Sequence, residues 1–273
     1  SVVEADVRNK EIWKKLLEKV DILFHFAAQT SSKVANENPC RDAEINLLPI
    51  INIIEVCQKN KFSPHIIFSG TVTEVGFTDT YPVNETFKDI PTTVYDINKL
   101  AAEKYLQYYS NQLDNHAVIL RLANVYGPGP RSSSADRGIL NLMIHKALRS
   151  EPLTIYGEGD FVRDYVYIDD VVEAFLTAAV KIDLLSGNYY IIGSGVGYTI
   201  KDAMNIIREA VTQKTGRRVE ILHVSLPKNL SQIEYRNFVA DTSKFSTATG
   251  WKAKVSLPEG INQTIDYFLK VKG

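Results

Sequence analysis

The run DILFHFAA, residues 21–28, is a short apolar stretch bounded by polar residues. Such a run is typical of a strand that is buried on both faces of a parallel sheet. Residues 10–19 before it and residues 41–59 after it have helical patterns, and the next apolar run is HIIFS, residues 65–69. Strands that alternate with helices of this length predict βαβ units. With right-handed crossovers, they predict a doubly wound α/β fold.

The alternation continues with a long amphipathic helix over residues 95–112 and a strand at HAVIL, residues 116–120. One residue disturbs the pattern. Pro49 lies inside the helical stretch of residues 41–59, where it removes a hydrogen-bond donor. We therefore expect either a kink at Pro49 or a helix that begins late.

The second half of the chain has a looser pattern of short strand and helix signals, with clear helices only at residues 199–214 and 257–269. We expect residues 1–125 to form the parallel-sheet domain, with segments near 154–195 returning to it. Residues 126–273 should form mainly a smaller α+β lobe.

Composition excludes several classes of protein. The chain is 45% hydrophobic and 23% charged, and its net charge of -1 gives no electrostatic footprint for nucleic acid or an anionic membrane. Cys40 and Cys57 cannot build a disulfide framework, and neither they nor the five scattered histidines make a metal motif. The longest apolar stretches, such as residues 171–180, are too short to span a bilayer. We predict a cytosolic, metal-free protein without nucleic-acid or membrane partners.

Tyr95 and Lys99 stand four residues apart in the predicted helix, so they share one of its faces. An ammonium held beside a phenol lowers the pKa of the phenol and makes it a general base. Such a spacing arises by chance once or twice among 14 tyrosines and 31 lysines and arginines. Context strengthens it, because Thr71 and Thr73 follow a predicted strand, and ligands bind at the carboxyl ends of strands in open α/β sheets.

Eight segments stand in an order that supports this interpretation: ADVR (5–8), FHFAA (24–28), Asn46, TVTEVG (71–76), YDINKLAAE (95–103), RLANVYGP (121–128), GEG with RDY (157–159 and 163–165), and Arg236 with Asp241 and Gly250-Trp251. In this order they resemble the extended short-chain dehydrogenase/reductase family of NAD-dependent nucleotide-sugar epimerases, dehydratases and decarboxylases. The resemblance covers essentially the whole chain. It implies a Rossmann-like sheet with a smaller substrate lobe.

The resemblance also implies three groups of site residues. The catalytic residues would be Thr71, Tyr95 and Lys99. The residues that bind NAD would be Asp6, Phe26, Ala27, Ala28 and Asn46, together with Tyr95 and Lys99. The residues that bind the nucleotide diphosphate of the sugar would be Asn124, Arg163 and Arg236, with Thr71 near the sugar itself.

The function that the resemblance implies is epimerisation through a transient keto sugar, most often at the 4-position, with no net redox change. A homodimer through the Tyr95 helix and the helix of residues 41–59 is also implied. Two alternatives stay open. One is a decarboxylase or a reductase that uses the same base, and the other is a non-catalytic dinucleotide-binding regulator.

The sequence departs from the family pattern at its beginning, because it holds no glycine-rich phosphate loop. We expect that loop within a βαβ beginning of on the order of 50 residues ahead of Ser1, unless the protein is a pseudo-enzyme. The stretch IGSGVG, residues 192–197, imitates such a loop, but Tyr198 stands where its last glycine should be. Thr199 and Asp202 favour a helix capping box there instead.

The second departure is chemical. The dehydratases of the family place two acids directly after the catalytic threonine, whereas Val72 and Thr73 follow Thr71. We therefore expect no dehydratase activity. Glu74 stands one place later, and a one-residue gap would align it with the glutamate of the sugar-acid decarboxylases. Its role is open.

Overall fold

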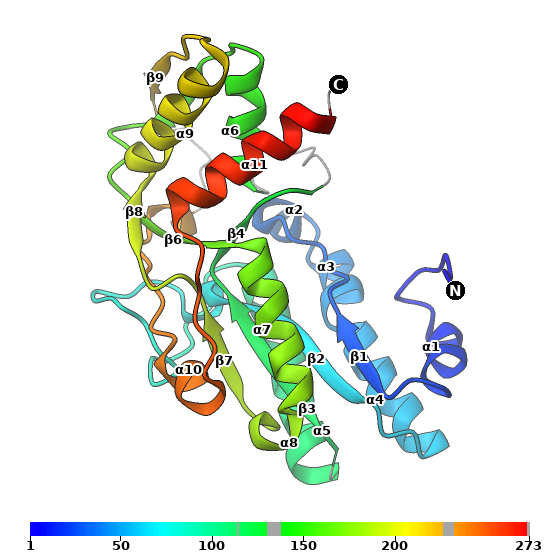
Figure 1. Ribbon diagram of the computed structural model, residues 1–273. Helices are drawn as coiled ribbons and strands as arrows, with labels where there is room; N and C mark the ends of the chain where they lie inside the picture. The colour runs from blue at the N-terminus through cyan, green and yellow to red at the C-terminus, as the bar shows by residue number, and fades with distance from the viewer. Residues whose placement is uncertain (114, 130–137, 226–231, 272–273) are drawn as a thin grey trace.

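Four parallel strands form the central sheet within the described residues, in the order β1 (Ile22–His25), β2 (His65–Thr71), β3 (Ala117–Leu122) and β7 (Tyr189–Ile192). The structure is a computed structural model that describes residues 1–113, 115–129, 138–225 and 232–271. The strands predicted at residues 21–28, 65–69 and 116–120 are confirmed. The parallel arrangement and the alternating helices confirm the predicted α/β class (Figure 1).

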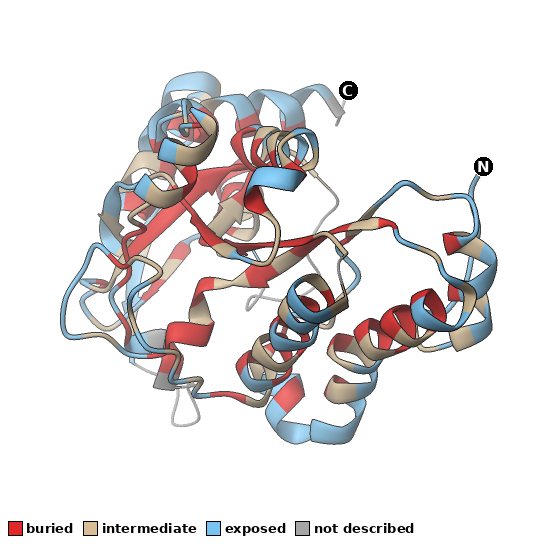
Figure 2. Ribbon diagram, turned by 90° about the horizontal axis from the view of Figure 1, so that it is seen from below, coloured by how far each residue is buried: buried red, intermediate tan, exposed pale blue. Residues whose placement is uncertain are grey.

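Helices cover both faces of this sheet, because successive side chains of a strand point to opposite faces. Ile66 and Phe68 pack on one face with α1 (Lys10–Leu17), α4 (Leu48–Asn60) and α5 (Val94–Leu113). Ile67, between them in the chain, packs on the other face with α7 (Ile168–Val180) and α8 (Ile182–Leu185). Figure 2 shows the buried residues along the strands and the inner sides of the helices.

The helical stretch that contains Pro49 is divided into two helices. α3 spans Pro39–Asn46, and α4 begins at Leu48 with Pro49 in its first turn. A proline is tolerated there, since the first backbone N–H groups of a helix have no partner within it. Of the two expectations for this stretch, the late start is the correct one. A further short helix, α2 (Ser32–Glu37), precedes α3.

The second lobe has a core of its own, built around α6 (Ile139–Leu148), α9 (Ile200–Thr215) and α11 (Leu257–Val271). These helices lie together at the top of Figure 1. Two small sheets belong to this half: β5 (Leu153–Tyr156) pairs with β9 (Ile221–Val224), and β6 (Val162–Tyr167) lies between β4 (Asn124–Tyr126) and β8 (Gly197–Thr199). α10 (Ser243–Thr249) packs near β7 instead.

The glycine-rich stretch before α9 is not a phosphate loop. Thr199 accepts a hydrogen bond from the Asp202 backbone N–H, and Asp202 accepts one from the Thr199 N–H. This reciprocal pair confirms the predicted capping box. Gly193 is required for a different reason, because a Cβ there would lie 2.5 Å from the Cβ of Ala240. None of the helices in the described ranges is long and apolar enough to cross a membrane.

Candidate active site

The site begins where β2 ends, at Thr71. The chain turns there into a short 3₁₀ helix, Val72–Val75, which Thr71 and Glu74 cap reciprocally. Gly76 ends this turn with a φ of 73°, and a Cβ there would meet the carbonyl oxygen of Ile90. A side chain at position 76 would therefore be strained and blocked. This geometry holds the hydroxyls of Thr71 and Thr73 at the carboxyl end of the sheet.

Tyr95 lies in the first turn of α5, where Asp96 and Thr93 fix the start of the helix. The Asp96 N–H donates to Thr93 Oγ1, and the Thr93 N–H donates to Asp96 Oδ2, each at 3.2 Å. Asp96 Oδ1 accepts a hydrogen bond from the Thr73 hydroxyl. The beginning of α5 is thereby tied directly to the turn that follows β2.

Thr71 and Tyr95 line one polar cavity of about 220 Å³ together with three residues that follow them in the chain, Asn124, Arg163 and Arg236. The other residues that line it are Thr30, Ser32, Val72, Thr73, Asp96, Leu122, Ala123 and Ile233. The structure therefore brings together five of the residues expected from the sequence, although they are far apart along the chain. Lys99 and the residues expected to bind NAD do not line this cavity, apart from Tyr95 itself.

The electrostatics of the Tyr95/Lys99 pair differ from the expectation. The pKa of Tyr95 is raised rather than lowered, because the phenol is buried and the carboxyl groups of Glu74, Asp96 and Asp42 disfavour a phenolate. Lys99 is buried with its Nζ 3.8 Å from the centre of the Phe68 ring. Burial lowers the pKa of Lys99 to about 8, although nearby carboxyl groups oppose this. The prediction of a lowered pKa for Tyr95 is therefore wrong.

Asn46 is a buried link between β1 and α5. Its side-chain amide donates to the Gln29 carbonyl at 2.9 Å and to Asp42 at 2.9 Å, and its oxygen accepts from the Gln29 N–H at 3.1 Å. Asp42 also accepts from the Asn98 amide at 2.8 Å. These bonds hold the chain after β1 against the helix that carries Tyr95, which is a structural contribution to the site.

The other residues expected to bind NAD lie at the carboxyl end of β1 and near the beginning of the chain. Phe26 is 57% exposed, and Ala27 beside it is exposed too. Ala28 is half-buried, and Asp6 is exposed and bound to the Arg8 guanidinium. That hydrogen bonding lowers the pKa of Asp6 to about 2. An exposed apolar ledge at the carboxyl end of a parallel strand fits a flat cofactor ring.

Glu74 is turned away from the cavity. Its Oε1 accepts from the Thr71 N–H at 3.2 Å, and its Oε2 lies 3.0 Å from Arg121 Nε in the interior. Burial raises the pKa of Glu74 well above its usual range, although Arg121 opposes the shift. Glu74 is not among the residues that line the cavity. The structure thus gives Glu74 a supporting position, not that of a decarboxylase acid.

Arg163 and Arg236 are both nearly buried, at 5% and 7% exposure, and they adjoin one another. Arg163 Nη1 donates to the backbone carbonyl of Arg236. The next residue, Asp164, accepts from the backbone N–H groups of Ser194, Gly195 and Ala240 at 2.7–3.0 Å. A fixed backbone therefore supports two guanidinium groups at the cavity.

The sequence reasoning did not identify Thr30, Ser32 and Asp96 as residues of the cavity, and it mentioned Thr73 only as a neighbour of Thr71. The position of Asp96 directly after Tyr95 was an available signal. Thr30 and Ser32 follow β1 in a polar run, which was the only other sign.

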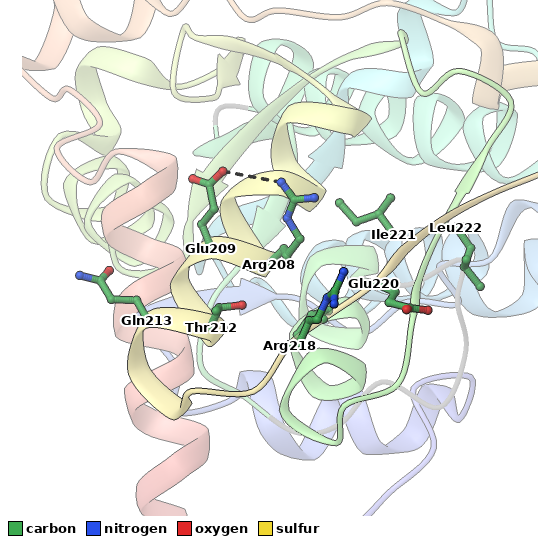
Figure 3. A pocket seen from close by; sticks show the side chains of 9 residues that line it. Arg208, Glu209, Thr212, Gln213, Arg218, Glu220, Ile221 and Leu222 are labelled. Atoms are coloured by element: carbon green, nitrogen blue, oxygen red, sulfur yellow. Dashed lines mark ion pairs between the residues drawn. The ribbon is translucent and has the colours of Figure 1, made fainter.

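A second and larger hollow, of about 830 Å³, lies in the other lobe between α9 and β9 (Figure 3). It is an open surface hollow whose charged residues are Arg208, Glu209, Arg218 and Glu220. Arg208 and Glu209 form an exposed ion pair at 3.8 Å. None of the expected site residues borders it, so the cavity beside Tyr95 is the better candidate for the active site.

A parallel α/β sheet with Tyr95 and Lys99 on one helix, and with hydroxyls and arginines around one cavity at its carboxyl edge, defines a class of protein. It is that of the dinucleotide-dependent α/β enzymes. More narrowly, the chain belongs to the NAD dependent epimerase/dehydratase family, whose model matches residues 1–193.

Individual relatives agree with this assignment. A putative UDP-glucose 4-epimerase of Methanocaldococcus jannaschii is 29% identical over 266 residues, which are 97% of this chain and 83% of the relative. A CDP-paratose 2-epimerase of Salmonella typhi is 27% identical over 288 residues, with coverage of 97% and 83%. Among solved structures, UDP-glucose 4-epimerase of Thermotoga maritima with UDP-glucose is similar at a TM-score of 0.89 and 30% identity, covering 99% of this chain and 85% of that one.

Proposed function

We propose that the protein is an NAD-dependent epimerase that acts on a nucleotide-diphosphate sugar, with the 4-position of the sugar as the reacting centre. The observation that carries this proposal is the single cavity that Thr71, Tyr95, Asn124, Arg163 and Arg236 share. The UDP-glucose 4-epimerase of Thermus thermophilus was solved as a complex with NAD. Its structure is similar to this chain at a TM-score of 0.84 and 29% identity, covering 97% of this chain and 83% of that one.

The residues divide the work as follows. Tyr95 exchanges a proton with the reacting hydroxyl of the sugar, and Thr71 orients the sugar so that this hydroxyl faces Tyr95. When bound, NAD supplies the hydride acceptor and donor, and its positively charged ring favours the phenolate that burial disfavours. Lys99, buried on the same helix as Tyr95, adds a second positive charge. Phe26, Ala27 and Ala28 would border the cofactor, and Asp6 would lie near its adenine. Asn46 would hold the loop after β1 in place through its bonds to Gln29.

The proposal includes the division of the chain into an NAD-binding part and a sugar-binding part that the sequence predicts. Residues 1–125, with return segments near 154–195, would bind NAD, and residues 126–273 would mainly bind the nucleotide sugar. β7 and α7 support the return segments, because β7 is the fourth strand of the parallel sheet and α7 packs on its face.

Epimerase activity has a direct test. The full-length protein, incubated with UDP-glucose or UDP-galactose and NAD, should interconvert the two sugars without net NADH formation or CO2 release. Net NADH change would favour a reductase, and CO2 from a UDP-hexuronic acid would favour a decarboxylase. Absence of turnover on a broad panel of nucleotide sugars would favour a non-catalytic regulator.

Arg236 is expected to hold the diphosphate, since guanidinium groups suit phosphate oxygens. Replacing it (Arg236→Met) should weaken the binding of UDP by about 10- to 100-fold, the loss of a charge-assisted hydrogen bond. Isothermal titration calorimetry measures this directly. Arg208→Met, an exposed arginine of the other hollow, is the matched control and should leave the affinity unchanged. Equal affinity in both variants would remove Arg236 from the site.

We also propose a homodimer through α4 and α5. Ile97, Tyr105 and Tyr108 are large side chains of α5 that are 43–52% exposed, and their spacing places them on one stripe of the helix. Light scattering that gives a monomer mass would contradict this. The cytoplasmic location expected from the cysteine content stays a prediction.

A further inference from the structure

Asp96 is a buried carboxyl group that the proposed reaction does not use. It is only 1% exposed, yet it lines the cavity next to Tyr95. Both of its oxygens are engaged: Oδ2 accepts from the Thr93 N–H at 3.2 Å, and Oδ1 accepts from the Thr73 hydroxyl. Asp96 therefore acts through its neighbours rather than as a free acid.

Thr73 connects Asp96 to Thr71. The hydroxyl oxygens of Thr71 and Thr73 lie 2.9 Å apart, and either could be the donor. Because a carboxylate only accepts hydrogen bonds, the single hydroxyl proton of Thr73 goes to Asp96. Thr71 must then donate its own proton to Thr73. Thr71 Oγ1 also accepts from the Thr73 N–H at 3.3 Å, so one lone pair of that oxygen remains for a ligand.

We propose that Asp96 and Thr73 are positioning residues that hold the Thr71 hydroxyl as a hydrogen-bond acceptor toward the bound sugar. The inference rests on the proposed function and states how the site recognises its substrate. The sugar must offer Thr71 the proton of a hydroxyl beside the reacting one, because the reacting hydroxyl gives its single proton to Tyr95 and the proton of Thr71 is already committed to Thr73.

The surroundings of Asp96 bear on its ionisation, which this arrangement needs. Burial raises the pKa of Asp96, whereas the hydrogen bonds from Thr73 and Thr93 and the charge of Arg236 oppose that shift. Two hydrogen-bond donors and one cation thus favour the ionised form of Asp96.

Asp96→Asn reverses the donor and acceptor roles along the hydrogen bonds that join residue 96, Thr73 and Thr71. The Thr93 N–H requires an acceptor, so the amide oxygen of the new side chain faces Thr93 and its NH₂ group faces Thr73. Thr73 then accepts from the amide and donates to Thr71, which turns Thr71 into a donor toward the sugar. The helix cap is preserved in this variant, so its effect reports on direction and not on folding.

Three variants of the full-length protein test this proposal with UDP-glucose and UDP-galactose. Thr73→Val and Asp96→Asn should each lower kcat by about 10- to 100-fold, because Thr71 then no longer holds the sugar in the reacting orientation; the affinity for UDP should be unchanged in both, and the Tm in Asp96→Asn, which keeps the helix cap. Thr73→Ser, which keeps the hydroxyl, should restore the parental kcat. The double variant should lose no more than Thr73→Val alone, because Asp96 acts through Thr73.

The outcomes separate cleanly. A parental kcat in Thr73→Val or Asp96→Asn, or losses that add fully in the double variant, would overturn the positioning role. So would a loss in Thr73→Ser as large as that in Thr73→Val, since Thr73→Ser keeps the hydroxyl that the positioning role requires. If the unaltered protein converts no nucleotide sugar at all, the proposed function itself fails, and the inference fails with it.

Discussion

Tyr95→Phe is expected to lower the turnover of the full-length protein about 10²- to 10⁴-fold, the usual contribution of a positioned proton-transfer group. The phenol lines the cavity beside Thr71, and phenylalanine keeps its ring while removing the only atom that can exchange a proton. Burial raises the pKa of Tyr95, so the phenol is neutral in the folded protein and makes no ionic contribution to its stability. The Tyr95→Phe variant should therefore be as stable as the parent.

Tyr105→Phe is the matched control for this prediction. Tyr105 lies on the same helix but is 43% exposed and does not border the cavity. Its loss of a hydroxyl should leave turnover unchanged. Initial rates with saturating nucleotide sugar, together with UDP titrations, distinguish lost chemistry from lost binding. A Tyr95→Phe enzyme as active as Tyr105→Phe would end the assignment of Tyr95 as the catalytic group.

The second large effect is expected at Arg121, which is completely buried among carboxyl groups. Its guanidinium donates to Glu103 at 2.8 Å and to Asp89 at 2.6 Å, and it lies 3.0 Å from Glu74. Its other face lies 3.7 Å from the centre of the Tyr189 ring. Arg121→Met removes the cation and leaves these acids together in the interior. The free energy of unfolding should fall by about 3–5 kcal/mol, the usual result of breaking a buried ion pair on one side.

Urea titration followed by the fluorescence of Trp13 and Trp251 measures this loss, since both tryptophans are buried. The control is Arg149→Met, because Arg149 and Glu151 form an ion pair that is about half exposed. Such surface pairs contribute less than about 1 kcal/mol. Adding Glu103→Leu to Arg121→Met should recover part of the stability by removing an unpaired acid. Equal effects of Arg121→Met and Arg149→Met would show that the buried network is not a stabilising element.

The two predictions are connected through Glu74. This residue accepts the Thr71 N–H on one side and faces Arg121 on the other. The buried network therefore supports the backbone that presents the Thr71 hydroxyl, although no member of it borders the cavity. Replacing Arg121 should therefore also disturb the position of Thr71, because Glu74 contacts both residues.

Several parts of the fold could be predicted from local sequence. DILFHFAA and HIIFS predicted buried strands because an apolar run of that length suits a strand covered on both faces. The capping box of Thr199 and Asp202 was predictable for a similar reason, since both partners lie within one turn. The start of α4 at Leu48, next to Pro49, was left open between two possibilities, because proline is compatible with both.

The meeting of the cavity residues could not be predicted from local sequence. Their types and order suggested a family, and the family suggested their roles, while their meeting around one cavity depends on the packing of the two halves of the chain. Asp96 illustrates the difference, because its sequence neighbours account for its cap with Thr93 but do not show whether it also meets a residue of another element. Its contact with Thr73 depends on how α5 packs against the turn after β2.

The sequence by itself therefore determined the parallel α/β architecture and the placement of Tyr95 and Lys99 on one helix, both of which depend on short-range periodicity and spacing. The tertiary structure decided the electrostatic state of that pair, the inward direction of Glu74 and the hydrogen-bond chain from Asp96 to Thr71. Burial and the placement of distant charges set a pKa, and the direction of a hydroxyl proton depends on which acceptor lies beyond it. Neither quantity is contained in the spacing of residues along a chain.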